Sequence, residues 1–174
     1  IGYILKRGAS GNAQIASWGY APDGRINSAG FMHSGQNRIF EYNYLAGSNL
    51  LETLTMPNGM TLEQSYEAKR DLLADMDYNR GTTLVSRRAY AYDALGRPTV
   101  RTLLRQGTTR RDVFSYNGRS ELAAATLGTD AYAYDYDNIG NRKTAREIEE
   151  EFAYTANELN QYTSIEQSIP NSCL

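Results

Sequence analysis

A tyrosine-centred motif recurs along the chain at intervals of 18 to 26 residues. In each copy a Tyr is followed four or five residues later by Gly, Arg or a stand-in, and then by an apolar stretch. A unit of this length cannot bury a core alone, so consecutive units must stack on one another. The sequence therefore predicts a repeat protein. Its anchoring tyrosines are Tyr20, Tyr42, Tyr66, Tyr92, Tyr116, Tyr136 and Tyr154.

The fullest copy, YAYDALGRPTVRTLL, starts at Tyr90. Side chains alternate across a strand, so Tyr90 and Tyr92 are expected on one face. Asp93 can bond to its own backbone two residues on, and Gly96 accepts a positive φ. The β-rich PTV that follows is typical of a returning strand. Each unit is therefore predicted to be a β-hairpin.

The other copies keep this pattern, and six of the seven anchors have an aromatic residue two positions before them. Tyr66 is the exception, since Gln64 precedes it and no turn glycine follows. The predicted structural motif comprises Trp18, Tyr20, Gly24, Arg25, Phe40, Tyr42, Gly47, Tyr66, Tyr90, Tyr92, Asp93, Gly96, Arg97, Phe114, Tyr116, Tyr134, Tyr136, Asp137, Gly140, Arg142, Phe152 and Tyr154.

A second set of turn signals separates each returning strand from the next aromatic strand: HSGQN, PNG, NRG, QGT and GTD. Two turns per repeat predict a meander, hence an all-β chain with one curved antiparallel sheet. Residues 1–16 are expected to form an edge strand or degenerate repeat, residues 17–165 about seven hairpins, and residues 166–174 a non-repeat tail. The run Glu147–Glu151 lacks turn chemistry; we expect solvated surface, as one helical turn or a charged strand end.

The composition favours a single-layer sheet. Fourteen Tyr, four Phe and one Trp, with a mean hydropathy of -0.58, describe large side chains that are amphipathic, and Tyr can pack its ring across strands while its hydroxyl stays in water. Fifteen Arg against three Lys suit cation–π stacking on these rings. The net charge of -2 argues against a nucleic-acid interface.

The chain begins at Ile1 without an initiator Met, which indicates an excised fragment, and shows neither a signal peptide nor a stretch of about 20 apolar residues. The lone Cys173 lies in the tail, so it cannot form an internal disulfide. A fragment of a sheet has unpaired edge strands, expected near residues 1–6 and 154–165. These edges predict self-association, or else a sheet that curls far enough for neighbouring hairpins to cover them.

The chain resembles the YD-repeat, or Rhs (rearrangement hotspot), family over about residues 17–165. The most specific stretches are YAYDALGR, YDYDNIGNR and YTANELNQYTSI. The resemblance implies a long β-sheet that spirals into a hollow shell, as in bacterial polymorphic toxins, the C component of insecticidal toxin complexes and teneurins. In the bacterial toxins the shell encloses a toxic C-terminal domain. The Asp-Pro dipeptide of the family's self-cleaving element does not occur in this chain.

No catalytic constellation is evident. His33, the one histidine, and its neighbour Ser34 lie in a polar turn, and adjacent residues point apart. Calcium is a weaker alternative to turn capping for the carboxylates of YDYDNIGN, whose oxygens come from Asp135, Asp137, Asn138 and Asn141. The tyrosine faces also leave sugar stacking open as an alternative to ladder packing.

The sequence thus predicts a non-enzymatic structural segment without cofactor, metal or catalytic residues. Its partners would be the rest of a longer polypeptide and an enclosed C-terminal cargo. Following the resemblance, the parent protein is expected to be secreted or on the bacterial cell surface. The alternative is a module that binds carbohydrate or another cell-surface ligand, and an enzyme is the third alternative.

Overall fold

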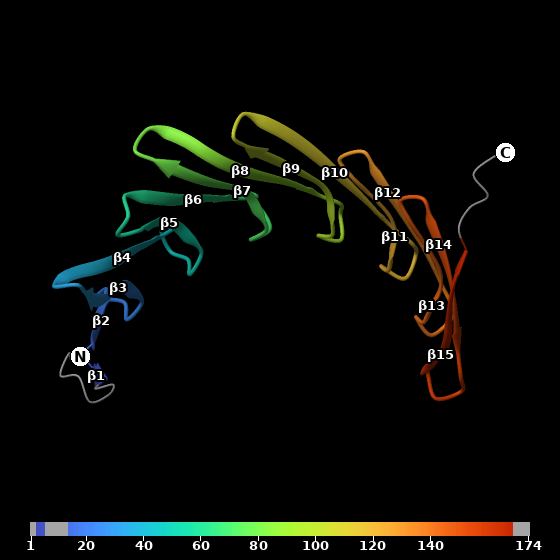
Figure 1. Cartoon of the computed structure of the whole chain (residues 1–174). Helices are drawn as coiled ribbons and strands as arrows, with labels where there is room; N and C mark the ends of the chain where they lie inside the picture. The colour runs from blue at the N-terminus through green and yellow to red at the C-terminus, as the bar shows by residue number, and fades with distance from the viewer. Residues whose placement is uncertain (1–2, 6–13, 169–174) are drawn as a thin grey trace. The chain divides into compact units, whose positions relative to one another are not determined.

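The computed structural model describes residues 3–5 and 14–168, and all of its regular structure is β-strand. The strands are β1 (Tyr3–Leu5), β2 (Gln14–Tyr20), β3 (Ile26–His33), β4 (Gln36–Tyr44), β5 (Leu51–Thr55), β6 (Met60–Tyr66), β7 (Leu73–Arg80), β8 (Thr83–Tyr92), β9 (Pro98–Arg105), β10 (Thr108–Tyr116), β11 (Leu122–Leu127), β12 (Asp130–Tyr136), β13 (Arg142–Glu147), β14 (Glu150–Ala156) and β15 (Tyr162–Ser168). The order of strands in the sheet is the order in the sequence, and neighbouring strands such as β2 with β3 and β13 with β14 pair antiparallel (Figure 1).

The predicted all-β meander of tandem hairpins is therefore confirmed. The chain divides into two compact units, a first unit of residues 1–89 with 104–107 and a second unit of residues 90–103 with 108–174. The strand β2 crosses the expected boundary at residue 17, and β15 crosses the one at residue 166. The expected tail beyond residue 168, with Cys173, lies outside the described residues. Within the described part, no helix is present that could cross a membrane.

Several strands present one half-buried face and one exposed face. In β12 the residues Tyr132, Tyr134 and Tyr136 are half-buried, whereas Ala133 and Asp135 between them are exposed. The same alternation runs along β4 and β14. The aromatic side chains thus line one face of each unit, as the two-residue spacing of the motif predicts.

Small residues occupy the centre of the aromatic face. Ala125 lies between Phe114 and Tyr132 on the adjacent strands, and Ala145 lies in the same way between Tyr134 and Phe152. Only 7% of Ala125 and 2% of Ala145 are exposed, and Leu62 is the other buried apolar residue among those described. The rings fold over the small side chains from both sides, so this single layer has a thin, local core in place of a central one.

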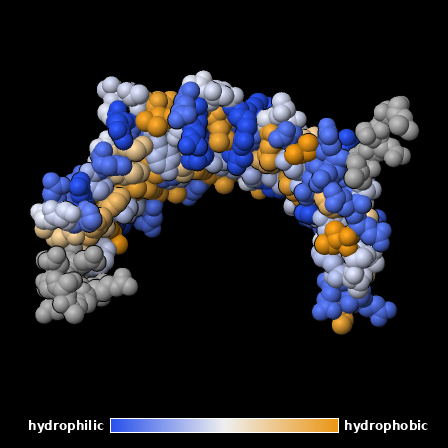
Figure 2. All heavy atoms as spheres, in the orientation of Figure 1, coloured by the Kyte–Doolittle hydropathy of each residue, from blue (hydrophilic) through white to orange (hydrophobic). Residues whose placement is uncertain are grey.

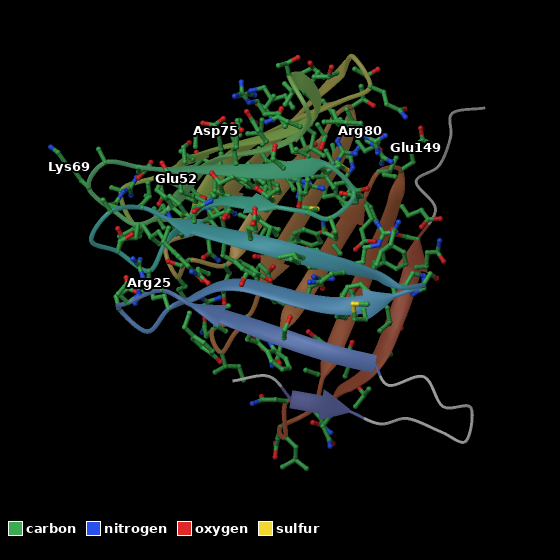
Figure 3. All side chains as sticks on the ribbon, turned by 90° about the vertical axis from the view of Figure 1, so that its left-hand side faces the viewer. Arg25, Glu52, Lys69, Asp75, Arg80 and Glu149 are labelled. Carbon is green, nitrogen blue, oxygen red and sulfur yellow. The ribbon has the colours of Figure 1, made fainter. Side chains whose placement is uncertain are left out.

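Polar side chains cover both faces of the sheet. In Figure 2 the apolar residues stand singly or in small groups among hydrophilic ones. Figure 3 shows side chains projecting from both sides of the strands, with Arg25 and Lys69 in turns at one end of the strands of the first unit and Arg80 at the other end. The two ends of the strands carry different turns, and only the end with Arg25 carries the tyrosine motif.

The turns opposite the tyrosine motif are short. Ser34 and Gly35 have φ of 50° and 73°, and Gln106 and Gly107 have φ of 49° and 77°, the values of a two-residue hairpin turn. The run Glu147–Glu151, for which we expected a helical turn or a charged strand end, ends β13 at Glu147 and begins β14 at Glu150. Between them it forms such a turn around Ile148, whose φ is 61°. The pairing of β13 with β14 requires a turn there, although no residue of the run favours one.

Candidate functional site, the ladder of tyrosine turns

Four turns of the second unit share one hydrogen-bonded geometry. Each begins with Asp or Asn, whose Oδ1 accepts hydrogen bonds from the backbone N–H groups two and four residues later. This arrangement satisfies the amide groups that the reversing chain would otherwise leave unpaired. The acceptors and donors are Asp93 with Leu95 (2.9 Å) and Arg97 (3.0 Å), Asn117 with Arg119 (2.9 Å) and Glu121 (3.1 Å), Asp137 with Ile139 and Asn141 (2.9 Å each), and Asn157 with Leu159 and Gln161 (3.0 Å each).

In the first unit, the side chain that caps the turn lies within the turn and not at its first residue. Asp23 Oδ1 accepts from the backbone N–H of Arg25 at 3.1 Å, and Ser48 Oγ accepts from that of Leu50 at 3.1 Å. The turn after Tyr66, which has no glycine, nevertheless closes with a hydrogen bond of 2.9 Å from Glu67 N to Leu72 O. The turn therefore forms at all of these sites although its residues vary.

In four copies of the repeat, a tyrosine hydroxyl fastens one hairpin to the preceding one. The Tyr at the end of an even-numbered strand donates a hydrogen bond to the backbone carbonyl of the residue that begins the odd-numbered strand before it. A backbone carbonyl at a strand end gains a hydrogen-bond partner in this way. The pairs are Tyr44 with Ile26 (2.9 Å), Tyr66 with Leu51 (2.8 Å), Tyr116 with Pro98 (2.8 Å) and Tyr136 with Leu122 (2.9 Å).

These contacts fix the phase of the repeat at the residue directly before each turn. That residue is Tyr44 in the second copy and Ala156 in the last. The anchors Tyr42 and Tyr154, which the sequence suggested, lie two residues earlier on the aromatic face. With Tyr44 and Ala156 in these positions, the spacing of the repeat becomes more even. The sequence analysis missed this phase because YNY contains two tyrosines that could be the anchor, and in YTA the tyrosine lies two residues before the turn.

The last hairpin replaces the missing hydroxyl from the opposite strand. Ala156 pairs in register with Tyr162, the first residue of β15. The hydroxyl of Tyr162 accepts a hydrogen bond of 2.8 Å from the backbone N–H of Arg142, which begins β13. The fastening to the start of the preceding odd-numbered strand is therefore kept, although its polarity is reversed.

The arginine of each turn forms the second part of the ladder. Arg25 Nε donates to Asp23 at 2.7 Å, its guanidinium lies 4.9 Å from the centre of the Tyr44 ring, and Nη1 donates to the carbonyl of Ser48 in the next tyrosine turn. Arginine can make these contacts simultaneously because its guanidinium is planar and has several donors. Each such residue links two successive turns.

Arg97 repeats this arrangement in the second unit. It donates from Nε to Asp93 at 2.7 Å, lies 4.7 Å from the ring centre of Tyr116, and donates from Nη1 to Ser120 Oγ at 3.0 Å. In both cases an aspartate of the same turn holds the arginine, while the guanidinium also contacts the next turn. The predicted cation–π pairing of arginine with tyrosine is present in both units.

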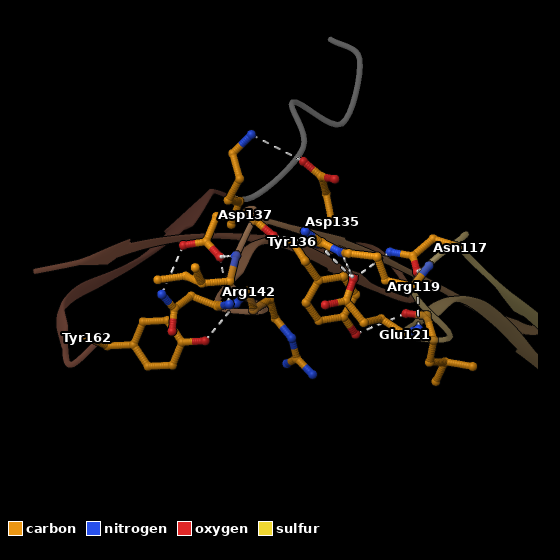
Figure 4. A network of polar contacts seen from close by, with 12 residues as sticks. Asn117, Arg119, Glu121, Asp135, Tyr136, Asp137, Arg142 and Tyr162 are labelled. Atoms are coloured by element: carbon orange, nitrogen blue, oxygen red, sulfur yellow. Dashed lines mark hydrogen bonds and ion pairs between the residues drawn. The ribbon is translucent and has the colours of Figure 1, made fainter. Parts of the chain in front are cut away.

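Figure 4 shows how the ladder continues. Arg119 is held by Glu121 at 2.9 Å and donates to the backbone carbonyl of Asp137 in the next turn. The carboxylate of Glu121 also accepts from Asn117 Nδ2 at 2.6 Å. Further along, Asn141 Nδ2 donates to Asp137 Oδ2 at 2.9 Å. The polar side chains of these turns thus make hydrogen bonds within their own turn or to the following turn.

Arg142 is inserted between aromatic rings. Its guanidinium carbon lies 4.5 Å from the ring centre of Tyr134 and 5.6 Å from that of Tyr154, and Nη1 lies 3.9 Å from Glu147. Burial alone would lower the pKa of Arg142, but its contacts with Tyr154 and other tyrosines raise the pKa above its ordinary value. Arg142 therefore remains charged.

Asp112 is a polar residue that the sequence analysis missed. It has no exposed surface, and its Oδ2 accepts from Arg101 Nη2 at 2.7 Å while Oδ1 lies 3.0 Å from Arg110 Nε. The backbone N–H of Gly128 donates to Oδ1 at 3.1 Å. A Cβ at position 128 would meet Arg110 at 3.1 Å, so glycine gives room for this cluster. In the sequence, the neighbouring arginines of RRD were the only available signal.

The carboxylates of the ladder are held in the ionised state. Burial opposes the ionisation of Asp112, but Arg101 and Arg110 outweigh it and lower the pKa of this carboxyl. The hydrogen bond from Asn141 lowers the pKa of Asp137, and that from Asn117 lowers the pKa of Glu121. Hydrogen bonds that stabilise the charged form account for these directions.

The remaining polar candidates lie apart from one another. His33 and Ser34 are exposed at the turn between β3 and β4. The oxygens of Asp137 accept hydrogen bonds from its own turn, and Asp135 pairs with Lys143 at 3.4 Å. Within the described residues, no group of three His, Cys, Asp or Glu side chains is placed to hold a metal ion. The hydrogen bonds and cation–π contacts of the tyrosine turns join one hairpin to the next.

The other residues of the predicted motif lie at matching places. Trp18 and Phe40 flank Ala29 across β2, β3 and β4 in the first unit. The rings of Tyr90 and Tyr92 stack with centroids 6.3 Å apart. The turn glycines have positive φ, as expected from the sequence for Gly96, and the values are 84° for Gly24, 72° for Gly47, 81° for Gly96 and 94° for Gly140.

Fold and turns together define an all-β repeat protein in which tandem hairpins are fastened by tyrosine and arginine side chains. No family model and no curated protein matches the sequence. Solved structures do match. A crystal structure of TcdB2-TccC3 without the hypervariable C-terminal region has a TM-score of 0.69 at 14% identity, over 87% of this chain and 9% of that chain.

Two further toxin structures match the fold of this chain. The Photorhabdus luminescens Tc holotoxin pore with a TccC3 mutation has a TM-score of 0.60 at 18% identity, over 90% of this chain and 8% of that chain. The crystal structure of TcdB2-TccC3 has a TM-score of 0.60 at 19% identity, with the same coverage. The chain thus spans less than a tenth of the length of each of these three chains. Its fold is that of these Tc toxin chains, which confirms the YD-repeat resemblance at the level of the fold.

Proposed function

We propose that this chain is a non-catalytic segment in the wall of a hollow YD-repeat shell, which encloses a C-terminal polypeptide of toxin type. The observation that carries the proposal is the ladder itself. In both units, hydroxyl and guanidinium groups that elsewhere serve as binding or catalytic groups are used to fasten one hairpin to the next. These contacts hold successive hairpins together in one continuous sheet, as the wall of a shell requires.

The surface chemistry supports a wall that holds cargo loosely. Only three apolar residues among those described are buried, and the exposed apolar side chains are scattered among polar ones (Figure 2). An unfolded polypeptide binds tightly to extended apolar patches, and these are rare on ordinary soluble surfaces. The matching toxin structures also support a parent protein that is secreted or carried on the bacterial surface.

Protease protection in the full-length polypeptide tests this function. The downstream segment should resist a protease that digests the same segment when it is produced alone. Arg97→Ala, which removes a link between two turns, should shorten the protection, whereas Arg111→Ala, at an exposed position, should not. A downstream segment that is digested equally fast inside the full-length protein would contradict the role in encapsulation.

Carbohydrate binding is the second candidate, and one hollow of the first unit favours it. This hollow of about 720 Å³ is lined by Arg25, Asn27, Asn43, Tyr44 and Glu52, among others. Amide, carboxylate and aromatic groups are those that hold sugar hydroxyls and ring faces. Asn27, Asn43 and Glu52 make no side-chain hydrogen bond among the described residues, so their polar atoms are free to bind a ligand.

A glycan array probed with the chain tests the second candidate. Binding of a neutral oligosaccharide that is lost in Asn43→Ala, and kept in Asn79→Ala on the same face outside the hollow, would support it. The registers place Asn43 opposite Thr53 and Asn79 opposite Thr61. The absence of any bound glycan would remove this candidate and leave the shell proposal unaffected.

A further inference from the structure

An asparagine followed by glycine occurs twice in this chain, as Asn58–Gly59 and as Asn117–Gly118. The backbone nitrogen that follows an asparagine can attack the side-chain amide carbon and displace ammonia. Glycine hinders this attack least, because it has no side chain and its backbone turns freely. Both pairs lie in hairpin turns, the first between β5 and β6 and the second between β10 and β11, so the two turns can be compared.

The two glycine nitrogens differ in their hydrogen bonding. The N–H of Gly59 donates to the carbonyl of Met56 at 3.0 Å. The N–H of Gly118 makes no hydrogen bond among the described residues. Gly118 is exposed, and a Cβ at this position would meet nothing within 4 Å. The nitrogen of Gly118 is therefore open to water and available as a nucleophile.

The amide carbonyl of Asn117 is also the better electrophile. Its Oδ1 accepts hydrogen bonds from the backbone N–H groups of Arg119 at 2.9 Å and Glu121 at 3.1 Å. Negative charge develops on this oxygen when a nucleophile adds to Cγ, and N–H groups that already point at the oxygen stabilise that charge. The Oδ1 of Asn58 accepts one such bond, from the N–H of Met60 at 3.1 Å. Both the nucleophile and the electrophile therefore favour reaction at Asn117.

From these observations we propose that Asn117 deamidates spontaneously. The nitrogen of Gly118 gives its proton to hydroxide and bonds to Cγ of Asn117. The bond from Cγ to Nδ2 then breaks, and Nδ2 takes a proton from water and leaves as ammonia, which restores the hydroxide. Water opens the resulting cyclic imide at one of its two carbonyl carbons. The product is aspartate or isoaspartate, and in sum one water is consumed and one ammonia is released.

The carboxylate of Glu121 makes this modification disruptive. Nδ2 of Asn117 donates to Glu121 Oε2 at 2.6 Å. The new carboxylate would have no hydrogen to donate, so two negative charges would meet. In the next turn, by contrast, Asp137 faces a donor, the Nδ2 of Asn141 at 2.9 Å. Deamidation should therefore loosen the turn, and with it the link that Arg119 makes to the next one.

Peptide mapping by mass spectrometry of the native chain, aged in mildly alkaline buffer, tests the proposal. Asn117 should be converted several-fold faster than Asn58, and a protein isoaspartyl methyltransferase should label the isoaspartate product. The same measurement in urea gives the ratio of the two rates without the fold, and there the preference for Asn117 should disappear. Equal conversion of the two sites in the folded chain, or a preference that urea leaves unchanged, would overturn the proposal.

Gly118→Ala supplies the matched variant. Ala94 occupies the equivalent position of another tyrosine turn, and a Cβ at position 118 has open space around it, so the variant should keep the fold. It should slow the conversion of Asn117 by about tenfold, because the added methyl group hinders the approach of the nitrogen to Cγ. The conversion of Asn58 should not change. An Asn117 that is converted as fast in the variant as in the native chain would contradict the proposed attack by the glycine nitrogen.

Amide hydrogen exchange measures the effect on the turn. The N–H groups of Arg119 and Glu121 should exchange faster in the aged chain, in proportion to the conversion of Asn117. Those of Leu159 and Gln161, which Asn157 holds in the same geometry, are the control and should exchange as before. Exchange at Arg119 and Glu121 that ageing leaves unchanged would show that the modification does not loosen the turn.

Discussion

The hydroxyl of Tyr136 donates a hydrogen bond of 2.9 Å to the backbone carbonyl of Leu122, fourteen residues earlier and at the beginning of β11. The bond joins the end of β12 to the start of the neighbouring strand β11, which belongs to the preceding hairpin repeat. Equivalent bonds are made by Tyr44, Tyr66 and Tyr116. A contact that recurs in this way contributes to stability once per repeat.

Replacing Tyr136 by Phe should lower the free energy of unfolding by about 1 kcal/mol, because the ring remains and the carbonyl of Leu122 loses its partner. Thermal or urea unfolding of the variant measures the loss. Tyr132→Phe on the same strand and face is the control, since its hydroxyl makes no hydrogen bond among the described residues. An equal effect of both substitutions would show that the hydroxyl does not fasten the hairpin.

Replacing Ala145 by Val should destabilise the second unit by about 1 to 3 kcal/mol. Ala145 is 2% exposed between Tyr134 and Phe152, so two added methyl groups would displace a ring. Ala133→Val is the matched control, because Ala133 is exposed on the opposite face and Val favours a strand. Chemical denaturation should separate the two variants. If Ala145→Val were as stable as the native chain, the rings would not pack over the small residue.

Replacing Ile148 by Gly should raise the stability by about 1 kcal/mol. A β-branched residue at a φ of 61° is strained, and the corresponding turn residue in β11–β12 is Gly128 with a φ of 68°. Part of the strain is offset by the hydrogen bond of 2.8 Å from Ile148 N to Ala131 O, which glycine keeps. A lower melting temperature of Ile148→Gly would show that the exposed side chain stabilises the turn more than its backbone conformation costs.

The residues explain how far the sequence could predict this structure. The pairing of an aromatic with a tyrosine two residues later, followed by Asp and Gly, identified the hairpins because alternation and turn geometry are local properties. The ladder was only partly predictable. The stacking of arginine on tyrosine follows from composition, but the partners Arg97 and Tyr116 are 19 positions apart. The burial of Asp112 between arginines, and the use of the Tyr162 hydroxyl where Ala156 has none, depend on the register between strands. No local pattern in the sequence specifies this register.

Acid should destabilise the protein only below about pH 5. The pKa values of Asp93, Asp112, Glu121 and Asp137 all lie below their ordinary values. Above about pH 5 these carboxyl groups are ionised in both the folded and the unfolded chain, so their contribution to stability is complete. As the pH falls through the ordinary values, the unfolded chain takes up protons first, and the stability is lost progressively toward the lowered pKa values of the folded state.

Urea unfolding between pH 7 and pH 3 measures this dependence. The midpoint should stay nearly constant to about pH 5 and fall below about pH 4. Asp112→Asn should cost about 2 kcal/mol at pH 7, because Arg101 and Arg110 lose their shared charge, and should lower the slope in acid, because one titrating group is removed. Asp130→Asn, at the exposed first residue of β12, is the control and should leave both quantities unchanged. A native chain that loses stability between pH 7 and pH 5 would mean that the carboxylates of the ladder are not held ionised by their partners.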